Sequence, residues 1–489
     1  MNDLPGMSQK ENINGDIVKL TITKVLTLLI STVTSMLLAR YRSLEEYGTY
    51  SQMLIVINLC TSIFMLGLPN SLNYFLVRSE TEKEKRDFVN VYYTLSTILS
   101  LILGISLSLS VHLIVKYFDN EYIGSFVYFL ALYPWTKIIT SSIENLLVVY
   151  RKPKVLLILK LSHNILLLGI VVLSQLAHIQ FETYMICFTA LEVIMTVIDY
   201  WLIRRTAGSL EPQLVWKMIK RIFAFSIPIG LASIVGIINI ELDKIVISQF
   251  FTTEELGIYS ACSTELPFTI VATSITAVAL PVMTAFVKNG AINNAIEKWK
   301  KTIYVSFAVI AIFSLGMAFF AEDAVVLLYG EKYLPGAGVF RVYSLILILK
   351  CTYWGMMLNA LGKTKFILVS SIVSLVVNIV LNYVCYYLFG FIGPAIATFV
   401  STVTMNLAQV IATCLITKTT IKNILPWKGI AVLLVINVLL GYSFLTIKKF
   451  IPLDSCITNI GETIVLGGIW AIIYIAICGK RVLNVFREI

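Results

Sequence analysis

Charged residues are scarce in this sequence. They make up 13% of its 489 residues, whereas about a quarter of the residues in a soluble domain are charged. Hydrophobic residues make up 58%, and the mean hydropathy is +0.86. A soluble fold of this length could not cover so much apolar surface, so we predict that lipid is the solvent for most of the chain.

Catalytic and metal-binding motifs are also lacking. The eight cysteines form no C-x-x-C pair, and the three histidines have no metal-ligand spacing. Gly362-Lys363-Thr364 looks like the end of a phosphate-binding loop, but Met357 stands where that loop needs a glycine. The longest polar stretches are too short for a catalytic domain; they lie near 204–221, 287–301 and 322–337. We therefore predict a transporter rather than an enzyme, with no catalytic residue, resident cofactor or metal.

A basic tail or basic domain is absent too, although the net charge is +10. The positive residues lie in short loops between apolar runs, so no nucleic-acid partner is expected. With the N-terminus placed inside, most of the 38 lysines and arginines fall in cytoplasmic segments. The outer segments hold Arg40, Arg42, Lys116, Lys332, Lys448 and Lys449. This asymmetry predicts a multi-pass protein of the bacterial inner membrane with both termini in the cytoplasm.

What the sequence does contain is a series of apolar runs, each near the roughly 20 residues that a membrane-spanning helix needs. We predict an all-α membrane protein with about fourteen such helices. They lie near residues 17–39, 50–76, 89–115, 122–149, 155–177, 181–203, 222–248, 257–286, 302–321, 338–361, 366–389, 392–416, 428–447 and 460–479. Residues 1–16 are polar and not typical of a cleavable signal, so we expect a cytoplasmic N-terminal segment and a retained first helix.

Two motifs occur twice at nearly the same interval. The pattern E-E-x-G-x-Y-S occurs at 45–51 and 254–260, and Lys-x-Lys occurs at 152–154 and 363–365. The interval covers six predicted helices, an even number, so both copies have the same orientation. This repeat predicts two parallel six-helix bundles related by an axis along the membrane normal. The bundles are expected at 17–205 and 222–417, joined by a cytoplasmic linker at 206–221, with two extra helices and a short tail in 418–489.

Four segments resemble bacterial polysaccharide-transport proteins, which include the O-antigen and related lipid-linked oligosaccharide flippases. They are Leu38–Ser51, Leu242–Ile245 with the following FFTTEELGIYSA, Asn359–Lys365 and Asn378–Ser401. The resemblance implies a fold shared with multidrug-and-toxin extruders and lipid II flippases, in which two bundles form a V that opens to each face in turn. It also implies a cargo of oligosaccharide on undecaprenyl pyrophosphate, with membrane lipid and other glycan-assembly membrane proteins as partners.

Ionisable residues inside the predicted spans are costly, so each is a candidate functional residue. A pyrophosphate cargo needs cations along its route, and we assign substrate binding to Lys24, Lys137, Lys244, Arg341 and Lys350. Carboxylates could bind a proton or a sodium ion and so couple transport to a gradient. We assign this role to Glu144, Glu192, Asp243 and Glu265.

Structural roles for these residues stay open at this point. Lys24 and Arg341 lie near helix ends and could extend to the interface. Asp243 and Lys244 could form a structural ion pair, and Glu192 could be neutral and bonded to a neighbouring helix. The predicted function is a lipid-linked oligosaccharide flippase. The alternatives are a drug or cation antiporter of the same fold, a membrane glycan polymerase or ligase, and a scaffold in a cell-wall or sporulation assembly.

Overall fold

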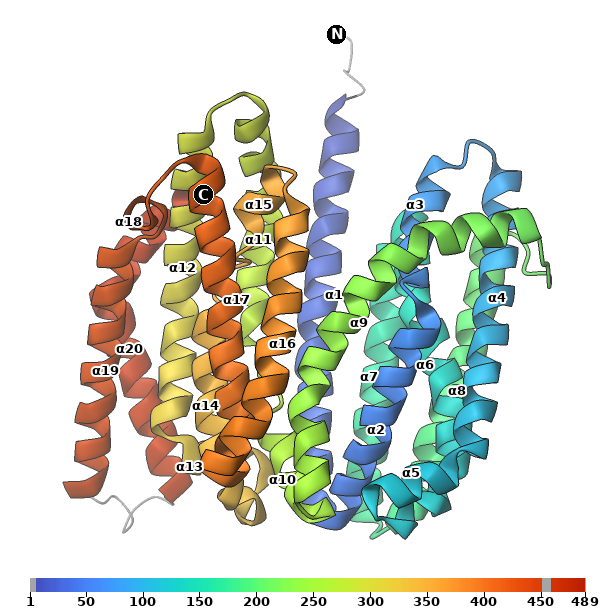
Figure 1. The fold of residues 1–489 in the computed structure, drawn as a ribbon, viewed down its shortest axis with the longest axis horizontal. Helices are drawn as coiled ribbons and strands as arrows, with labels where there is room; N and C mark the ends of the chain where they lie inside the picture. Colours follow the sequence, from blue (N-terminus) through green and yellow to red (C-terminus); the bar gives the residue numbers. More distant parts are fainter. Residues whose placement is uncertain (1–5, 451–458, 489) are drawn as a thin grey trace. The chain divides into compact units, whose positions relative to one another are not determined.

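The chain is mainly helical in the computed structural model, which describes residues 6–450 and 459–488 (Figure 1). No strand occurs among these residues, so the all-α prediction is confirmed. Within the described residues, twelve stretches are long and apolar enough to span a membrane. One of them, Thr364–Thr417, contains two helices. The helix Val127–Val149, which carries Lys137 and Glu144, is not among the twelve. These two differences account for the fourteen spans predicted from the sequence.

The chain divides into two compact units. The first unit comprises Met1–Glu241 and Ser248–Gly257, and the second comprises Leu242–Ile247 and Ile258–Ile489. The division passes through helices α9 (Trp216–Phe250) and α10 (Thr253–Cys262). The predicted bundle limits at 205 and 222 stay predictions.

The first unit contains the helices from α1 to α8 and parts of α9 and α10. Their bounds are α1 Gly6–Tyr41, α2 Leu44–Met65, α3 Leu68–Arg78, α4 Glu82–Leu109, α5 Val111–Phe118, the short η1 Glu121–Phe126, α6 Val127–Val149, α7 Pro153–Leu176 and α8 Phe181–Ala207. Buried apolar side chains of α3, α4 and α6 form its core, among them Leu72, Tyr92 and Ile139.

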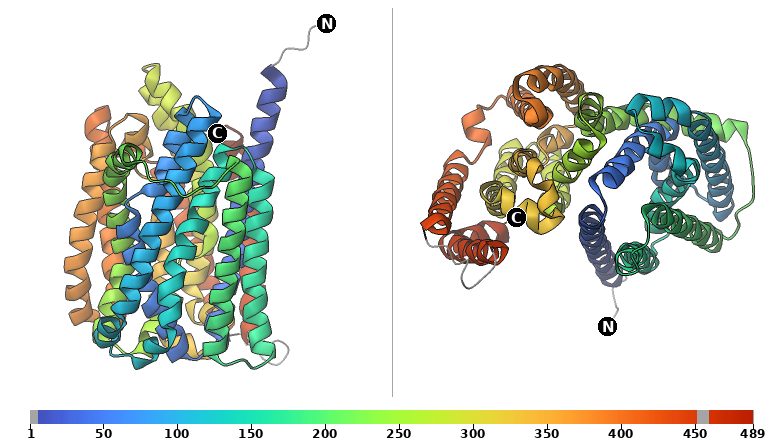
Figure 2. Two further views of the ribbon diagram at one scale, coloured as in Figure 1. Left: turned by 90° about the vertical axis from the view of Figure 1, so that its right-hand side faces the viewer. Right: turned by 90° about the horizontal axis from the view of Figure 1, so that it is seen from below.

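The second unit contains the remaining helices. Their bounds are η2 Pro267–Thr269, α11 Ile270–Lys288, α12 Ile292–Phe319, α13 Ala321–Tyr329, η3 Glu331–Gly336, α14 Ala337–Leu349, α15 Met356–Ala360, α16 Thr364–Phe389, η4 Gly390–Ile392, α17 Gly393–Thr417, α18 Ile421–Ile424, α19 Trp427–Phe450 and α20 Asn459–Arg487. Helix α12 is the centre of this unit and packs against α11, α14, α19 and α20. Figure 2 shows α19 and α20 in red, side by side at the margin of the unit.

Several predicted spans contain breaks. The span expected at 50–76 is interrupted between α2 and α3, where Leu66 and Gly67 have φ values of 40° and 74°. The span expected at 257–286 is interrupted before Pro267, whose ring cannot continue the hydrogen-bonding of α10. The span expected at 338–361 ends its first helix at Leu349 and resumes at Met356. Each break interrupts the regular main-chain hydrogen bonding of a helix within a predicted span.

The repeated motif has the same local role in both of its copies. The Ser43 hydroxyl accepts from the Glu46 main-chain N–H at 3.1 Å, and the Glu46 carboxylate accepts from the Ser43 N–H at 2.8 Å. Thr252 and Glu255 form the same pair of bonds, at 3.3 and 2.9 Å. These reciprocal bonds satisfy main-chain donors that a helix start leaves unpaired, so each copy fixes the start of a helix, α2 or α10.

The glycines of the motif bring the two copies into contact within the first unit. A Cβ on Gly48 would lie 2.0 Å from the Thr253 carbonyl oxygen, and a Cβ on Gly257 would lie 2.7 Å from the Leu44 carbonyl oxygen. The contact is reciprocal, because Leu44 and Thr253 occupy the same place in their copies. Glycine is therefore required in both copies for the starts of α2 and α10 to meet.

The outer faces of the helices are apolar, as expected for a chain in lipid. Leu173 of α7, Val380 of α16 and Ile475 of α20 expose 63%, 56% and 63% of their surface. The buried faces carry polar residues such as Asn378 and Asn437 as well as apolar ones. Polar groups are thus gathered inside the helix packing of each unit.

Candidate functional site

Asp243 is the most completely enclosed of the predicted site residues, with 1% of its surface exposed. One carboxylate oxygen, Oδ2, accepts from the hydroxyls of Tyr259 and Tyr343, at 3.1 and 2.6 Å. The other, Oδ1, accepts from the Asn382 amide at 3.2 Å and the Thr398 hydroxyl at 2.7 Å. All four donors are neutral side chains, and they come from α10, α14, α16 and α17.

Further oxygen atoms lie within the same cluster. The Asn378 carbonyl oxygen accepts from Asn382 at 2.9 Å and from Thr398 at 3.3 Å. The Asn382 carbonyl oxygen is buried and has no hydrogen-bond partner. Oxygen atoms of Asp243, Asn378, Asn382 and Thr398 are therefore gathered in one buried place. Carboxylate, carbonyl and hydroxyl oxygens are the ligands that hard cations prefer.

Lys137 belongs to a polar chain in the first unit. Its ammonium group donates to the side-chain oxygen of Asn58 on α2. The amide of Asn58 donates in turn to the Glu241 carboxylate on α9, at 2.8 Å. Glu241 is 5% exposed and Lys137 is half-buried, so an amide joins a half-buried lysine to a buried glutamate.

A second polar cluster in the first unit joins α6, α7 and α8. The ring of His163 lies 3.0 Å from the Glu192 carboxylate, and both side chains are buried. Two helical turns further on, Asp199 accepts from the Thr140 hydroxyl at 2.8 Å. The predicted Glu192 thus has a histidine partner on a neighbouring helix, whereas Asp199 was not predicted as a site residue from the sequence.

The remaining predicted residues lie nearer to the surface of their units. Lys24 of α1 and Glu144 of α6 form an ion pair at 3.6 Å in the first unit. Lys350, at the end of α14, pairs with Glu265 in the second unit. Arg341 donates to the Ala318 carbonyl at 3.0 Å. Lys244 lies next to Asp243 on α9. The assignment of these residues to substrate and ion binding stays a prediction.

Most residues of the Asp243 cluster were not predicted from the sequence. Asn378 and Asn382 are four residues apart in an apolar run, which places them on one helix face. Two amides on one face of a membrane helix are a signal that could have been noticed. Tyr259, Tyr343 and Thr398 carry no such signal, because single hydroxyl residues are common in membrane helices.

Comparison with known proteins gives the family. A family profile described as "Polysaccharide biosynthesis protein" matches residues 37–337. The chain belongs to this family. The predicted relationship to polysaccharide-transport proteins is therefore confirmed. A search of curated protein sequences finds no match to this member of the polysaccharide biosynthesis family.

Solved structures with the same fold are transport proteins. The lipid II flippase MurJ, in an inward closed conformation, is 17% identical with a TM-score of 0.72, over 95% of this chain and 100% of MurJ. An inward-facing multidrug resistance MATE family transporter of the MOP superfamily is 15% identical with a TM-score of 0.63, over 83% of this chain and 99% of the transporter. The fold predicted from the resemblance is confirmed, and this polysaccharide biosynthesis protein is a multi-pass membrane protein.

Proposed function

We propose that this protein is a flippase for an undecaprenyl-pyrophosphate-linked oligosaccharide, such as an O-antigen or capsule repeat unit. It would move this cargo from the cytoplasmic to the periplasmic leaflet of the bacterial inner membrane, by alternating access of two helix bundles. Family membership supports a role in polysaccharide biosynthesis, and the fold is that of a lipid II flippase. Other glycan-assembly membrane proteins are the expected partners.

Two lysines, the half-buried Lys137 and the exposed Lys350, support an anionic cargo that must be released again. Lys137 and Lys350 each have a carboxylate close by, Glu241 through Asn58 and Glu265 directly. A lysine is a mobile point charge that can exchange a carboxylate for a phosphate at little geometric cost. We assign both lysines to the pyrophosphate, and Lys24, Lys244 and Arg341 to its route.

The observation that carries the proposal of active transport is the buried Asp243 cluster. A carboxylate that is 1% exposed inside a membrane helix bundle is expensive to keep. Its cost is offset when a cation occupies the site during part of the cycle. The oxygen atoms of Asp243, Asn378, Asn382 and Thr398 suit a sodium ion, and the unpartnered Asn382 oxygen gives such an ion a ligand. We assign coupling to this site, with Glu144, Glu192 and Glu265 as carboxylates that could carry a proton.

Deletion of the gene tests the cargo. Undecaprenyl-linked oligosaccharide should then accumulate in the cytoplasmic leaflet, and surface glycan should disappear. Normal surface glycan, or shortened glycan chains without trapped intermediate, would contradict a flippase. The second of these results would instead identify a polymerase.

Complementation of this deletion tests the two lysines. The variants Lys137→Ala and Lys350→Ala should reach the membrane at wild-type levels and fail to restore surface glycan. Lys154→Ala is the matched control, because its exposed side chain lies at the start of α7 outside the polar networks. Full export by both the Lys137→Ala and the Lys350→Ala variant would remove these residues from the substrate route.

The shared fold with a multidrug resistance transporter favours one second candidate, an antiporter for drugs or organic cations. Its cargo would be positively charged, so it should be repelled by Lys137 and Lys350. Susceptibility of the deletion strain to cationic drugs distinguishes the two functions. Increased susceptibility with unchanged glycan would establish the antiporter.

A further inference from the structure

A basic pocket lies in the second unit at the ends of several helices. It is formed by the start of α12, by α18, by the start of α19 and by the end of α20, and its volume is about 920 Å³. Five cationic side chains line it together with one carboxylate, Glu297. The cations are Lys300, Lys301, Lys422, Lys428 and Arg481.

Three of these cations are not neutralised by any carboxylate in the described part of the chain. Lys300 pairs with Glu297 at 2.6 Å and Lys301 pairs with Glu488 at 2.7 Å. Within residues 6–450 and 459–488, no carboxylate pairs with Lys422, Lys428 or Arg481. The pocket therefore has an excess of positive charge that suits an anion with several oxygen atoms, such as a phosphate diester.

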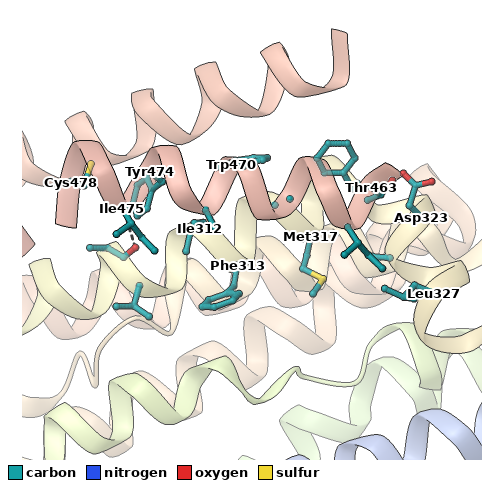
Figure 3. Close-up of a pocket in the computed structure, with 18 of the residues that line it drawn as sticks. Ile312, Phe313, Met317, Asp323, Leu327, Thr463, Trp470, Tyr474, Ile475 and Cys478 are labelled. Atoms are coloured by element: carbon teal, nitrogen blue, oxygen red, sulfur yellow. Dashed lines mark hydrogen bonds between the residues drawn. The ribbon is translucent and has the colours of Figure 1, made fainter. Parts of the chain in front are cut away.

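An apolar groove begins about one helical turn from this pocket. It runs between α12 and α20 and has a volume of about 520 Å³. Figure 3 shows Ile312, Phe313 and Met317 facing it from α12, and Trp470, Tyr474, Ile475 and Cys478 from α20. On α12, Tyr304 lines the pocket and Ala308, one turn later, lines the groove. On α20, Val485 lines the pocket and Val482, about one turn away, lines the groove.

The far end of the groove has no such excess of charge. Asp323 lines that end, and its carboxylate accepts from Lys448 at 2.5 Å. Lys448 also donates to the Thr463 hydroxyl at 2.9 Å. The groove is thus apolar along its length. The charge of Asp323 at one end is neutralised by Lys448, and the other end adjoins the cationic pocket.

We propose that the pocket and the groove together bind one anionic glycerophospholipid of the phosphatidylglycerol type. The phosphate diester lies among Lys422, Lys428 and Arg481, and an acyl chain lies along the groove between α12 and α20. This lipid is bound in addition to the cargo, and it stabilises the packing of α19 and α20 against α12.

The charge and the position of the pocket select this class of lipid. A phosphatidylcholine carries its own cation, which would be repelled by the three side chains. Free phosphate would gain nothing from the groove. Trp427 lines the pocket with 47% of its surface exposed, and its ring N–H donates to the Ile421 carbonyl at 3.0 Å. An exposed tryptophan beside lysines is typical of the level of lipid headgroups.

Lipid titration of the purified full-length protein, followed by native mass spectrometry, tests the headgroup site. The probes are phosphatidylglycerol, phosphatidylcholine and inorganic phosphate. Phosphatidylglycerol should bind best, and the double variant Lys422→Gln, Lys428→Gln should weaken its binding roughly tenfold or more. The control Lys363→Gln, Lys365→Gln removes the same charge from exposed residues at the start of α16 and should bind like the wild type.

A pair of adjacent glycines tests the groove. Gly467 lines it and Gly468 does not, and a Cβ on either would meet no atom within 4 Å. Gly467→Leu should fill the groove and reduce phosphatidylglycerol binding, whereas Gly468→Leu should leave it unchanged. The proposal fails if phosphatidylcholine or inorganic phosphate binds as tightly as phosphatidylglycerol, or if the pocket and control variants bind alike. It also fails if undecaprenyl phosphate occupies the site and phosphatidylglycerol cannot displace it, because the site would then belong to the cargo.

Discussion

Single residues set the chemistry of this protein, and Asp243 shows how. A lone aspartate in an apolar helix is compatible with an ion pair, a proton site or a metal-ion site. Its surroundings decide among these, because its carboxylate accepts from four neutral donors and lies beside an unpartnered amide oxygen, none of which brings a positive charge. A carboxylate arranged in this way is suited to receive a cation.

Sodium binding at this residue can be measured without transport. The thermal stability of the wild-type protein should rise with sodium concentration at constant ionic strength, because a ligand that binds the folded state stabilises it. Asp243→Asn keeps the shape of the side chain and should lose this response. Asp199→Asn is the matched control, since it removes a buried carboxylate from the first unit.

Two results would contradict the assignment to Asp243. One is an equal response to sodium in Asp243→Asn and the wild type. The other is a loss of the response in Asp199→Asn alone, which would move the ion to the first unit. A wild-type protein that responds to pH but not to sodium would make the coupling ion a proton.

At the scale of helices, the repeated motif fixes where two of them begin. Both copies use a hydroxyl and a glutamate to close the first turn, and both place a glycine against the other copy's main chain. The repeat therefore encodes a helix start and a helix contact at once. This explains why the pattern combines acidic residues with a glycine.

Substitution of these glycines should destabilise the protein. In Gly48→Ala the new methyl group would meet the Thr253 carbonyl, and we expect a cost of about 1–3 kcal/mol from overpacking. Gly257→Ala should behave in the same way, and the double variant should cost less than the sum because both glycines serve one contact. The measurement is thermal or denaturant unfolding of the purified protein.

Gly169→Ala provides the comparison for this series. Gly169 lies within α7, and a Cβ there would meet no atom within 4 Å. Alanine is the better helix former, so this variant should be as stable as the wild type or more stable. If Gly48→Ala were equally well tolerated, the close contact between the two copies would be refuted.

At the scale of the whole molecule, the distribution of lysine and arginine predicts which loops face the cytoplasm. The loop between α7 and α8, at His178, should be outside, and the segment between α8 and α9, at Glu211, should be inside. Alkaline phosphatase fused after His178 should therefore be active, and the same fusion after Glu211 should be inactive. The reverse pattern would invert the topology and the proposed direction of transport.

The sequence by itself determined the membrane spans, the duplicated motif and the family. Each of these can be detected from local composition or from a short continuous stretch of sequence, so no knowledge of packing is needed. Lys137, Glu192 and Asp243 could be singled out for the same reason, since a charge in an apolar run is conspicuous by itself.

Only the tertiary structure decided which residues meet. Thr398 and Asn382 reach Asp243 across 155 and 139 residues of sequence, and the pocket beside Trp427 joins helices from α12 to α20. The physical reason is that apolar side chains occupy both the lipid-facing and the buried faces of most of these helices, so hydropathy alone does not reveal how each helix is rotated. Rotation and depth are set by packing against neighbours, and they decide whether a side chain faces lipid, a groove or a buried carboxylate.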